Sequence, residues 1–108
     1  MFAKGKSFSN FPFRILWMAV ENQIGLKAGF SASTKNFKKA TDRNKIKRLM
    51  REAYRLQKND LAFQLSSANK ALHLFFIYTG KDIPTYDLIY EKTGNVLKRI
   101  IKLVNENI

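Results

Sequence analysis

Apolar and polar residues alternate along three short stretches of the chain, and each alternation predicts a β-strand. In residues 13–20 both sides of the strand are largely apolar, which predicts one side packed on helices and the other at least partly covered. In residues 26–33 apolar residues alternate with small or polar ones, as in a strand with one buried face. The run from Leu72 to Tyr78 is apolar almost throughout, which is typical of a central strand.

Two longer stretches have the helical period of about 3.6 residues. The first runs from Asp42 to about Lys58, with Thr41 or Asp42 at its N-terminus. The second begins after Thr85, which is a capping residue, and carries a long apolar stripe. In the first helix five apolar residues share one arc and are predicted to face the core: Ile46, Leu49, Met50, Ala53 and Leu56.

The remaining segments carry weaker signals. We interpret residues 1–12 as a connection and Glu21-Asn22-Gln23 as a hairpin turn, and residues 61–70 are ambiguous between further helix and loop. The order strand, strand, helix, strand, helix puts a helical crossover between the second and third strands. The predicted class is α+β or split α/β, in a single domain spanning residues 1–108.

Positive charge dominates the composition. Lys and Arg number 20 against 8 Asp and Glu, a formal net charge of +12, and half of the basic residues lie between Lys35 and Lys58. This concentrated excess predicts a polyanionic partner. The absence of cysteine excludes disulfides and thiolate metal sites and fits a reducing compartment. No apolar run is long enough to span a membrane and the first residues do not form a signal peptide, so we expect a cytoplasmic protein.

The first predicted helix has a basic side opposite its apolar arc. The residues on this side include no carboxylate: Arg43, Asn44, Lys47, Arg48, Arg51 and Arg55. Four of them follow one another at intervals of four residues, so their like charges repel in the free protein. A polyanion along the helix would relieve this repulsion, which favours a phosphate-binding face over an ordinary solvated one. The loop before the helix is also basic.

Catalysis by protein side chains is not indicated. His73 is the only histidine and lies in an apolar run, which favours a core or sheet position over a catalytic one. Asp82, Asp87 and Glu91 form the only acidic grouping, and carboxylates near a helix N-terminus more often complement the helix dipole than bind Mg²⁺. The chain contains neither a P-loop nor a Gly-x-Ser-x-Gly motif. Binding is therefore the predicted activity.

Three segments resemble the protein component of bacterial ribonuclease P. The stretch from Arg43 to Arg55, RNKIKRLMREAYR, resembles the family's RNR signature. The segment from Phe2 to Phe8 resembles the part that follows the family's first helix, and Gly29 to Lys35 resembles its Gly-x-Ser-x-Ser-x-Lys strand end. Since the final strand and helix also come in the expected order, the resemblance covers nearly the whole chain.

The resemblance implies an α+β fold in which a mixed β-sheet packs with helices and the signature helix lies in a left-handed βαβ crossover. Periodicity carries no information about this hand, and right-handed crossovers are the physical default. The sequence also departs from the family. Position 45 is Lys where arginine is usual, which keeps the charge but loses the paired hydrogen bonds. The resemblance aligns Phe2 with the last aromatic of the family's N-terminal helix, one wall of its leader cleft, so we expect this sequence to lack most of that helix. Leu16 stands where some relatives have a cleft aromatic.

The implied function is that of a subunit in an RNA-based endonuclease. A catalytic RNA with bound Mg²⁺ removes the 5′ leader of precursor tRNA, and the protein binds that RNA and the leader. The resemblance implies no catalytic residue, no cofactor held by the protein alone, no membrane and no required protein partner. The residues implied to bind RNA are Arg43, Asn44, Lys45, Lys47, Arg48, Arg51, Arg55, Lys35, Lys38 and Lys39, and those implied for the leader cleft are Phe2, Phe13, Arg43 and Asn44.

The residues taken alone leave other classes open. A structural RNA-binding protein of the ribosomal type would share the charge and the fold, but it would bind ribosomal RNA and take no part in cleavage. A DNA-binding helix is a weaker alternative, because no turn and partner helix precede Arg43 as they do in a helix-turn-helix.

Overall fold

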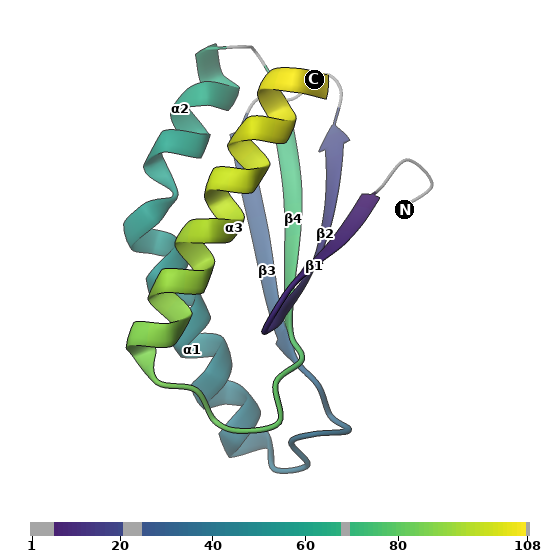
Figure 1. The fold of residues 1–108 in the computed structure, drawn as a ribbon, viewed down its shortest axis with the longest axis vertical. Helices are drawn as coiled ribbons and strands as arrows, with labels where there is room; N and C mark the ends of the chain where they lie inside the picture. Colours follow the sequence, from purple (N-terminus) through teal and green to yellow (C-terminus); the bar gives the residue numbers. More distant parts are fainter. Residues whose placement is uncertain (1–5, 21–24, 68–69, 108) are drawn as a thin grey trace.

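The computed structural model describes residues 6–20, 25–67 and 70–107. Figure 1 shows a β-sheet with the helices in front of one of its faces. In chain order the elements are β1 (Lys6–Asn10), β2 (Phe13–Val20), β3 (Gly25–Ala32), α1 (Ala40–Gln57), α2 (Asn59–Ser67), β4 (Ala71–Tyr78) and α3 (Tyr86–Asn107). The predicted α+β class is confirmed.

The sheet is mixed, with the strand order β1-β2-β4-β3. β2 is antiparallel to both β1 and β4, whereas β3 is parallel to β4. β4 is therefore a central strand, as its continuous apolar run predicts. The chain passes from β3 through α1 and α2 to β4. In Figure 1, β3 and β4 both run downwards, β4 lies to the right of β3 and the helices lie in front, so this crossover is left-handed, as the resemblance implied.

The core lies between the sheet and the helices. Phe76 of β4 is at its centre, with ring centroids 5.9 Å from Phe13, 5.3 Å from Phe30 and 6.0 Å from Tyr54. α3 buries the stripe predicted from its period: Ile89, Val96, Leu97, Ile100 and Val104. The described helices therefore cover one face of the sheet, and none of them covers the opposite face.

The helix boundaries differ only slightly from those predicted. α1 begins at Ala40 after an N-cap at Lys39 that makes no side-chain capping bond, so Asp42 is a first-turn residue and not the cap. Thr85 does cap α3, because its Oγ1 accepts a hydrogen bond from the Leu88 amide at 3.3 Å. The ambiguous stretch forms α2. The turn predicted at Glu21-Asn22-Gln23 lies outside the described residues.

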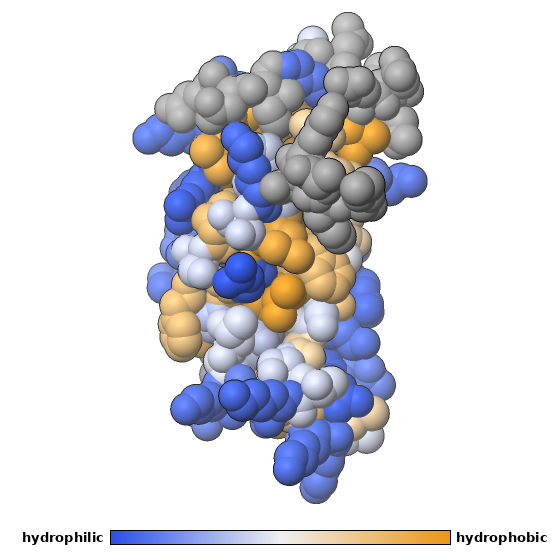
Figure 2. Space-filling view, turned by 90° about the vertical axis from the view of Figure 1, so that its right-hand side faces the viewer, coloured by the Kyte–Doolittle hydropathy of each residue, from blue (hydrophilic) through white to orange (hydrophobic). Residues whose placement is uncertain are grey.

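Residues 6–10 form a strand, so the connection predicted for this stretch is wrong. β1 pairs with β2 from Lys6 opposite Trp17 to Asn10 opposite Phe13. Phe8 packs on the core, and the Arg99 guanidinium lies 4.1 Å from the centroid of its ring. Figure 2 faces the β1 side and shows apolar side chains gathered in its middle, with hydrophilic ones around them. Pairing and packing thus stabilise a strand whose own propensity is weak.

Candidate nucleic-acid interface

α1 has one side buried against the sheet and the other exposed. Ile46, Met50 and Ala53 are fully buried as predicted, but Leu56 is 50% exposed and Tyr54 is buried instead. The helix is therefore rotated slightly about its axis relative to the prediction, so that Tyr54 and not Leu56 faces the core. The residues opposite the buried side, which we call the basic face of α1, are exposed except for Lys47, which is half-buried: Asn44, Lys45, Lys47, Arg48, Arg51 and Arg55.

Arg43 is partly buried and holds the loop before α1. Its Nη1 donates to the backbone carbonyl of Phe37 at 2.8 Å and to that of Lys38 at 2.9 Å. A charged donor makes stronger hydrogen bonds than a neutral one. One nitrogen of the first signature residue therefore serves the protein's own backbone.

The loop at residues 33–39 is fixed at several points. Phe37 is buried beside Tyr78, with the ring centroids 6.0 Å apart. The side-chain amide nitrogen of Asn36 donates to the backbone carbonyls of Thr79 and Gly80, both at 3.3 Å. The three lysines predicted to bind RNA are exposed along this loop: Lys35, Lys38 and Lys39. They extend the positive surface beyond the start of α1.

One residue of the basic face is paired with a carboxylate. The Arg55 Nε and Nη2 atoms donate to the two carboxylate oxygens of Glu52, at 3.0 and 2.7 Å. This hydrogen bond lowers the pKa of Glu52, so the carboxylate is charged at neutral pH. No other ion pair involves the basic face among the described residues. The like-charge repulsion predicted along the helix is thus partly cancelled at Arg55 and remains at Lys47, Arg48 and Arg51.

Three of the four residues predicted for a leader cleft lie among the described residues. Phe13 is 1% exposed and packs against Phe76 and Tyr78 on the helix side of the sheet, so its ring is not available to a nucleic acid. That assignment is wrong. Phe2 lies outside the described residues. Of the remaining two, Asn44 is exposed and Arg43 is bonded to the loop.

A second surface, of which the sequence pointed only to Leu16, lies on the side of the sheet away from the helices. Leu16 is opposite Phe75 in the register, and Gly29 is on the other side of Phe75. A Cβ atom at Gly29 would lie 2.8 Å from the Phe75 ring, so the glycine gives this ring its place. No described helix covers this outer face, whose residues are exposed or half-buried: Arg14, Leu16, Met18, Lys27, Ser31, His73, Phe75 and Ile77.

The described residues offer no group of three or more His, Cys, Asp or Glu side chains that would hold a metal ion. His73 lies on β4, half-buried, in the sheet position predicted for it. No helix of the described residues has the length and apolar character needed to cross a membrane.

Comparisons with known proteins point to one family. The model of the family described as Ribonuclease P matches residues 1–101. The ribonuclease P protein component of Porphyromonas gingivalis is 29% identical over 102 residues, covering 93% of this chain and 74% of that protein. The protein component of Chlorobaculum tepidum is 35% identical over 85 residues, covering 73% of this chain and 55% of that protein.

Solved structures of ribonuclease P proteins have the same fold. The protein from Staphylococcus aureus is 27% identical with a TM-score of 0.72, covering 92% of this chain and 84% of that one. The protein from Thermotoga maritima is 29% identical with a TM-score of 0.71, covering 91% of this chain and 86% of that one. The chain therefore belongs to the Ribonuclease P family, as a protein component of that endonuclease, which has an RNA subunit as its partner.

Proposed function

We propose that this protein binds the catalytic RNA of ribonuclease P through the basic face of α1 and the loop at residues 33–39. The observation that carries the proposal is the arrangement of Lys47, Arg48 and Arg51 on a helix whose other side is anchored in the core. A rigid helix holds these cations at fixed spacing, so RNA phosphates gain contacts without ordering the protein. Guanidinium groups add paired hydrogen bonds to phosphate oxygens.

We further propose that the 5′ leader of precursor tRNA lies on the outer face of the sheet. Leu16, Met18 and Phe75 give this face an apolar centre for unstacked bases, and Arg14 and Lys27 supply positive charge for the phosphates. Ser31 is small enough for a nucleic-acid backbone to approach β3 closely. Single-stranded RNA is typically held by this combination of aromatic and basic groups.

The chemical step in this proposal belongs to the RNA. Basic side chains repel a divalent cation, and the described carboxylates are not grouped to hold one, so the protein residues do not fit a Mg²⁺ site. Mg²⁺ would be bound by the RNA subunit. The protein would lower the electrostatic cost of bringing RNA and precursor tRNA together, and the complex would promote endonucleolytic removal of the leader in the cytoplasm, with no further protein partner.

Competition between RNAs tests the first part of the proposal. Ribonuclease P RNA and ribosomal RNA fragments of equal length would be titrated against the labelled chain at one salt concentration, because nonspecific binding depends on length and salt. We expect the ribonuclease P RNA to compete at least tenfold better, about 1.4 kcal/mol. Equal competition, or a preference for ribosomal RNA, would contradict the proposal and favour a structural RNA-binding protein of the ribosomal type.

A leader-dependent affinity tests the second part. The reconstituted holoenzyme should bind precursor tRNA more tightly than mature tRNA, and Phe75→Ala should reduce this ratio by about tenfold, since stacking on an aromatic ring is worth about 1–3 kcal/mol per base. Phe63→Ala is the matched control, because Phe63 is exposed on α2 and off the outer face. If both variants keep the wild-type ratio, the leader does not use the outer face.

A further inference from the structure

A pocket of about 390 Å³ lies between the C-terminal half of α1 and the free edge of the sheet. Pockets that take a small organic ligand begin at about 300 Å³. This β3-edge pocket is lined by Ala28, Gly29, Phe30, Arg51, Tyr54, Arg55 and Lys58. It shares Arg51 and Arg55 with the basic face of α1, and adds a strand edge and an aromatic wall.

The strand edge brings backbone hydrogen-bonding groups into the pocket. The backbone amide of Gly25 donates to the Lys70 carbonyl at 3.2 Å, and that of Ser33 donates to the Tyr78 carbonyl at 3.3 Å. The backbone N–H and C=O groups of the odd-numbered residues of β3 therefore point toward β4. Since N–H and C=O of one strand residue point the same way, those of Ala28 and Phe30 point outward. Neither amide has another partner among the described residues. The pocket thus offers two donors and two acceptors along one line.

The opposite wall carries the positive charge. Arg51 is exposed and unpaired among the described residues, whereas Arg55 is held in place by Glu52 at 2.7 Å. The Lys58 Nζ atom lies 6.0 Å from the centroid of the Tyr54 ring, within the range of a cation–π contact. Tyr54 and Phe30, with centroids 5.5 Å apart, form the inner wall. None of the lining residues is acidic.

We propose that the β3-edge pocket binds one nucleotide of single-stranded RNA, with its phosphate on Arg51, Arg55 and Lys58 and its base edge on the backbone of Ala28 and Phe30. A nucleotide combines an anion with a flat group that has both donors and acceptors, and the two walls match these parts. The inference rests on the proposed function, because the RNA would be one that the basic face of α1 already holds.

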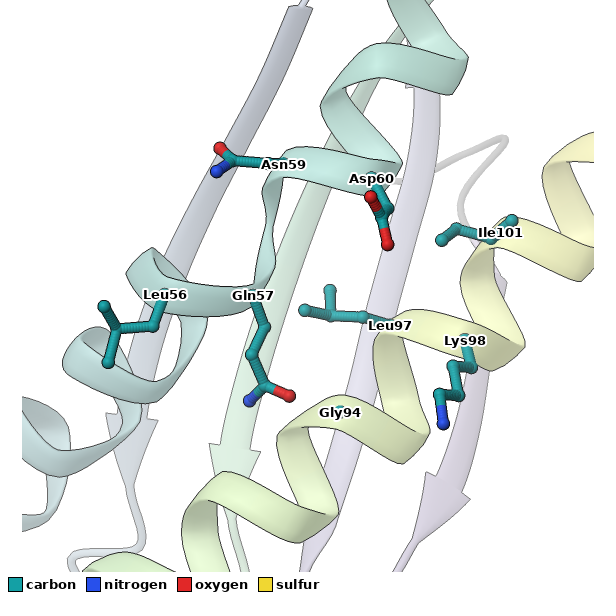
Figure 3. A pocket seen from close by; sticks show the side chains of 8 residues that line it. All are labelled: Leu56, Gln57, Asn59, Asp60, Gly94, Leu97, Lys98 and Ile101. Atoms are coloured by element: carbon teal, nitrogen blue, oxygen red, sulfur yellow. The ribbon is translucent and has the colours of Figure 1, made fainter.

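A second cavity of the described residues has different chemistry. It has a volume of about 320 Å³ and lies between α3 and the junction of α1 with α2 (Figure 3). Asp60 would repel a phosphate there, and the Gln57 amide already donates to the carbonyls of Ala53 and Tyr90, at 3.2 and 2.9 Å. Lys98 lines this cavity and provides a matched control for Lys58.

An acidic peptide added as a further strand would also use a free edge and basic residues. RNA is favoured because the pocket is continuous with a longer basic surface, on which Arg48 precedes Arg51 by one helical turn. A peptide strand would pair along the whole edge of β3, whereas Arg51, Arg55 and Lys58 line a pocket that includes only Ala28 to Phe30 of this strand.

Backbone amide NMR of the full ¹⁵N-labelled chain tests the proposal, with single-stranded hexaadenylate, inorganic phosphate and hexaglutamate as separate probes. We expect hexaadenylate to shift the Ala28 and Phe30 amides together and saturably, and to leave those of Lys27 and Ser31, which point toward β4, nearly unchanged. Lys58→Gln should raise the Kd for hexaadenylate about threefold at low salt, and Lys98→Gln should not change it.

Three results would overturn the nucleotide site. Hexaadenylate binding that leaves the Ala28 and Phe30 amides unshifted would place the RNA elsewhere. Shifts equal to those produced by inorganic phosphate would reduce the pocket to an anion site, and shifts with hexaglutamate alone would favour an added peptide strand. The competition between ribonuclease P RNA and ribosomal RNA is a separate readout, so the nucleotide site can fail while the proposed function stands.

Discussion

Arg43 donates from Nη1 to the backbone carbonyl of Phe37 at 2.8 Å, and this contact joins the first turn of α1 to the loop that precedes it. Phe37 is itself buried in the core, so the guanidinium fixes the loop relative to both the helix and the sheet. The exposed lysines of the loop gain a defined position from this contact. The first residue of the signature thus positions the loop that carries these lysines.

Arg43→Lys keeps the charge and removes the planar donor geometry. We expect the free energy of unfolding to fall by about 1.5 kcal/mol, at the lower end of the range for a hydrogen bond to a charged group, and amide hydrogen exchange to increase in residues 33–39. Urea unfolding and hydrogen exchange would measure the two effects. Arg48→Lys is the control, because Arg48 is exposed and makes no hydrogen bond to another described residue. Equal effects of both substitutions would exclude the positioning role.

Charge reversal on the basic face tests its contact with phosphates. Arg48→Glu with Arg51→Glu should weaken binding of ribonuclease P RNA and make the slope of log K against log salt less steep by about 2, one for each lost phosphate contact. The circular dichroism spectrum should not change, since both residues are exposed.

The control for this pair is Lys98→Glu with Lys102→Glu, which makes the same change in net charge toward the end of α3. Its salt slope should stay near that of the wild type. If the two double variants have the same slope, RNA binding reports overall charge and not the basic face of α1.

The facing of α1 makes a prediction about stability. Ala53 is fully buried, so Ala53→Arg places an unpaired charge in the core and should cost more than about 3 kcal/mol, a large part of the stability of a small domain. Leu56→Arg, three residues later, should fold normally because Leu56 is half exposed. Thermal melting distinguishes the two, and a wild-type melting temperature for Ala53→Arg would contradict the observed facing.

Burial raises the pKa of Tyr54 to about 12. The unfolded chain loses this proton near pH 10 while the folded chain keeps it until about pH 12, so the free energy of unfolding should fall as the pH rises between these values, by at most about 2–3 kcal/mol. Tyr54→Phe should make the fall shallower. Some fall should remain, because burial also raises the pKa of Tyr78. Identical pH profiles of urea unfolding for wild type and variant would contradict the shift.

Periodicity predicted the elements that bury a continuous apolar face, such as α1, β2 and β4, to within a few residues. It missed β1, because a short strand with Ser7, Ser9 and Asn10 has little propensity of its own and forms through pairing with β2 and the contact of Arg99 on Phe8. Periodicity also predicted that Leu56 is buried, whereas it is half exposed and Tyr54 is buried. The helical period does not show where the sheet ends, and it is at the sheet edge that Tyr54 packs against Phe30.

The sequence predicts the basic side of α1, but it does not predict which side of β2 faces the helices. A run of basic residues on one helix side is visible in the sequence, and α1 exposes it. The facing of β2 was not visible, because both of its sides are largely apolar and alternation alone does not say which side the helices cover. Alternation therefore offers no check on the cleft role that the resemblance implies for Phe13, which lies in the core, and it does not indicate that Phe75 lies on the outer face. The pairing of Arg55 with Glu52 depends on side-chain conformations that spacing does not fix.

Cleavage of precursor tRNA by the cognate ribonuclease P RNA at low Mg²⁺, with and without this protein, tests the central claim most directly. We predict that the protein restores cleavage at the mature 5′ end, that the Arg48→Glu, Arg51→Glu variant does not, and that the Lys98→Glu, Lys102→Glu variant does. Cleavage that is the same with and without the wild-type chain would contradict the account.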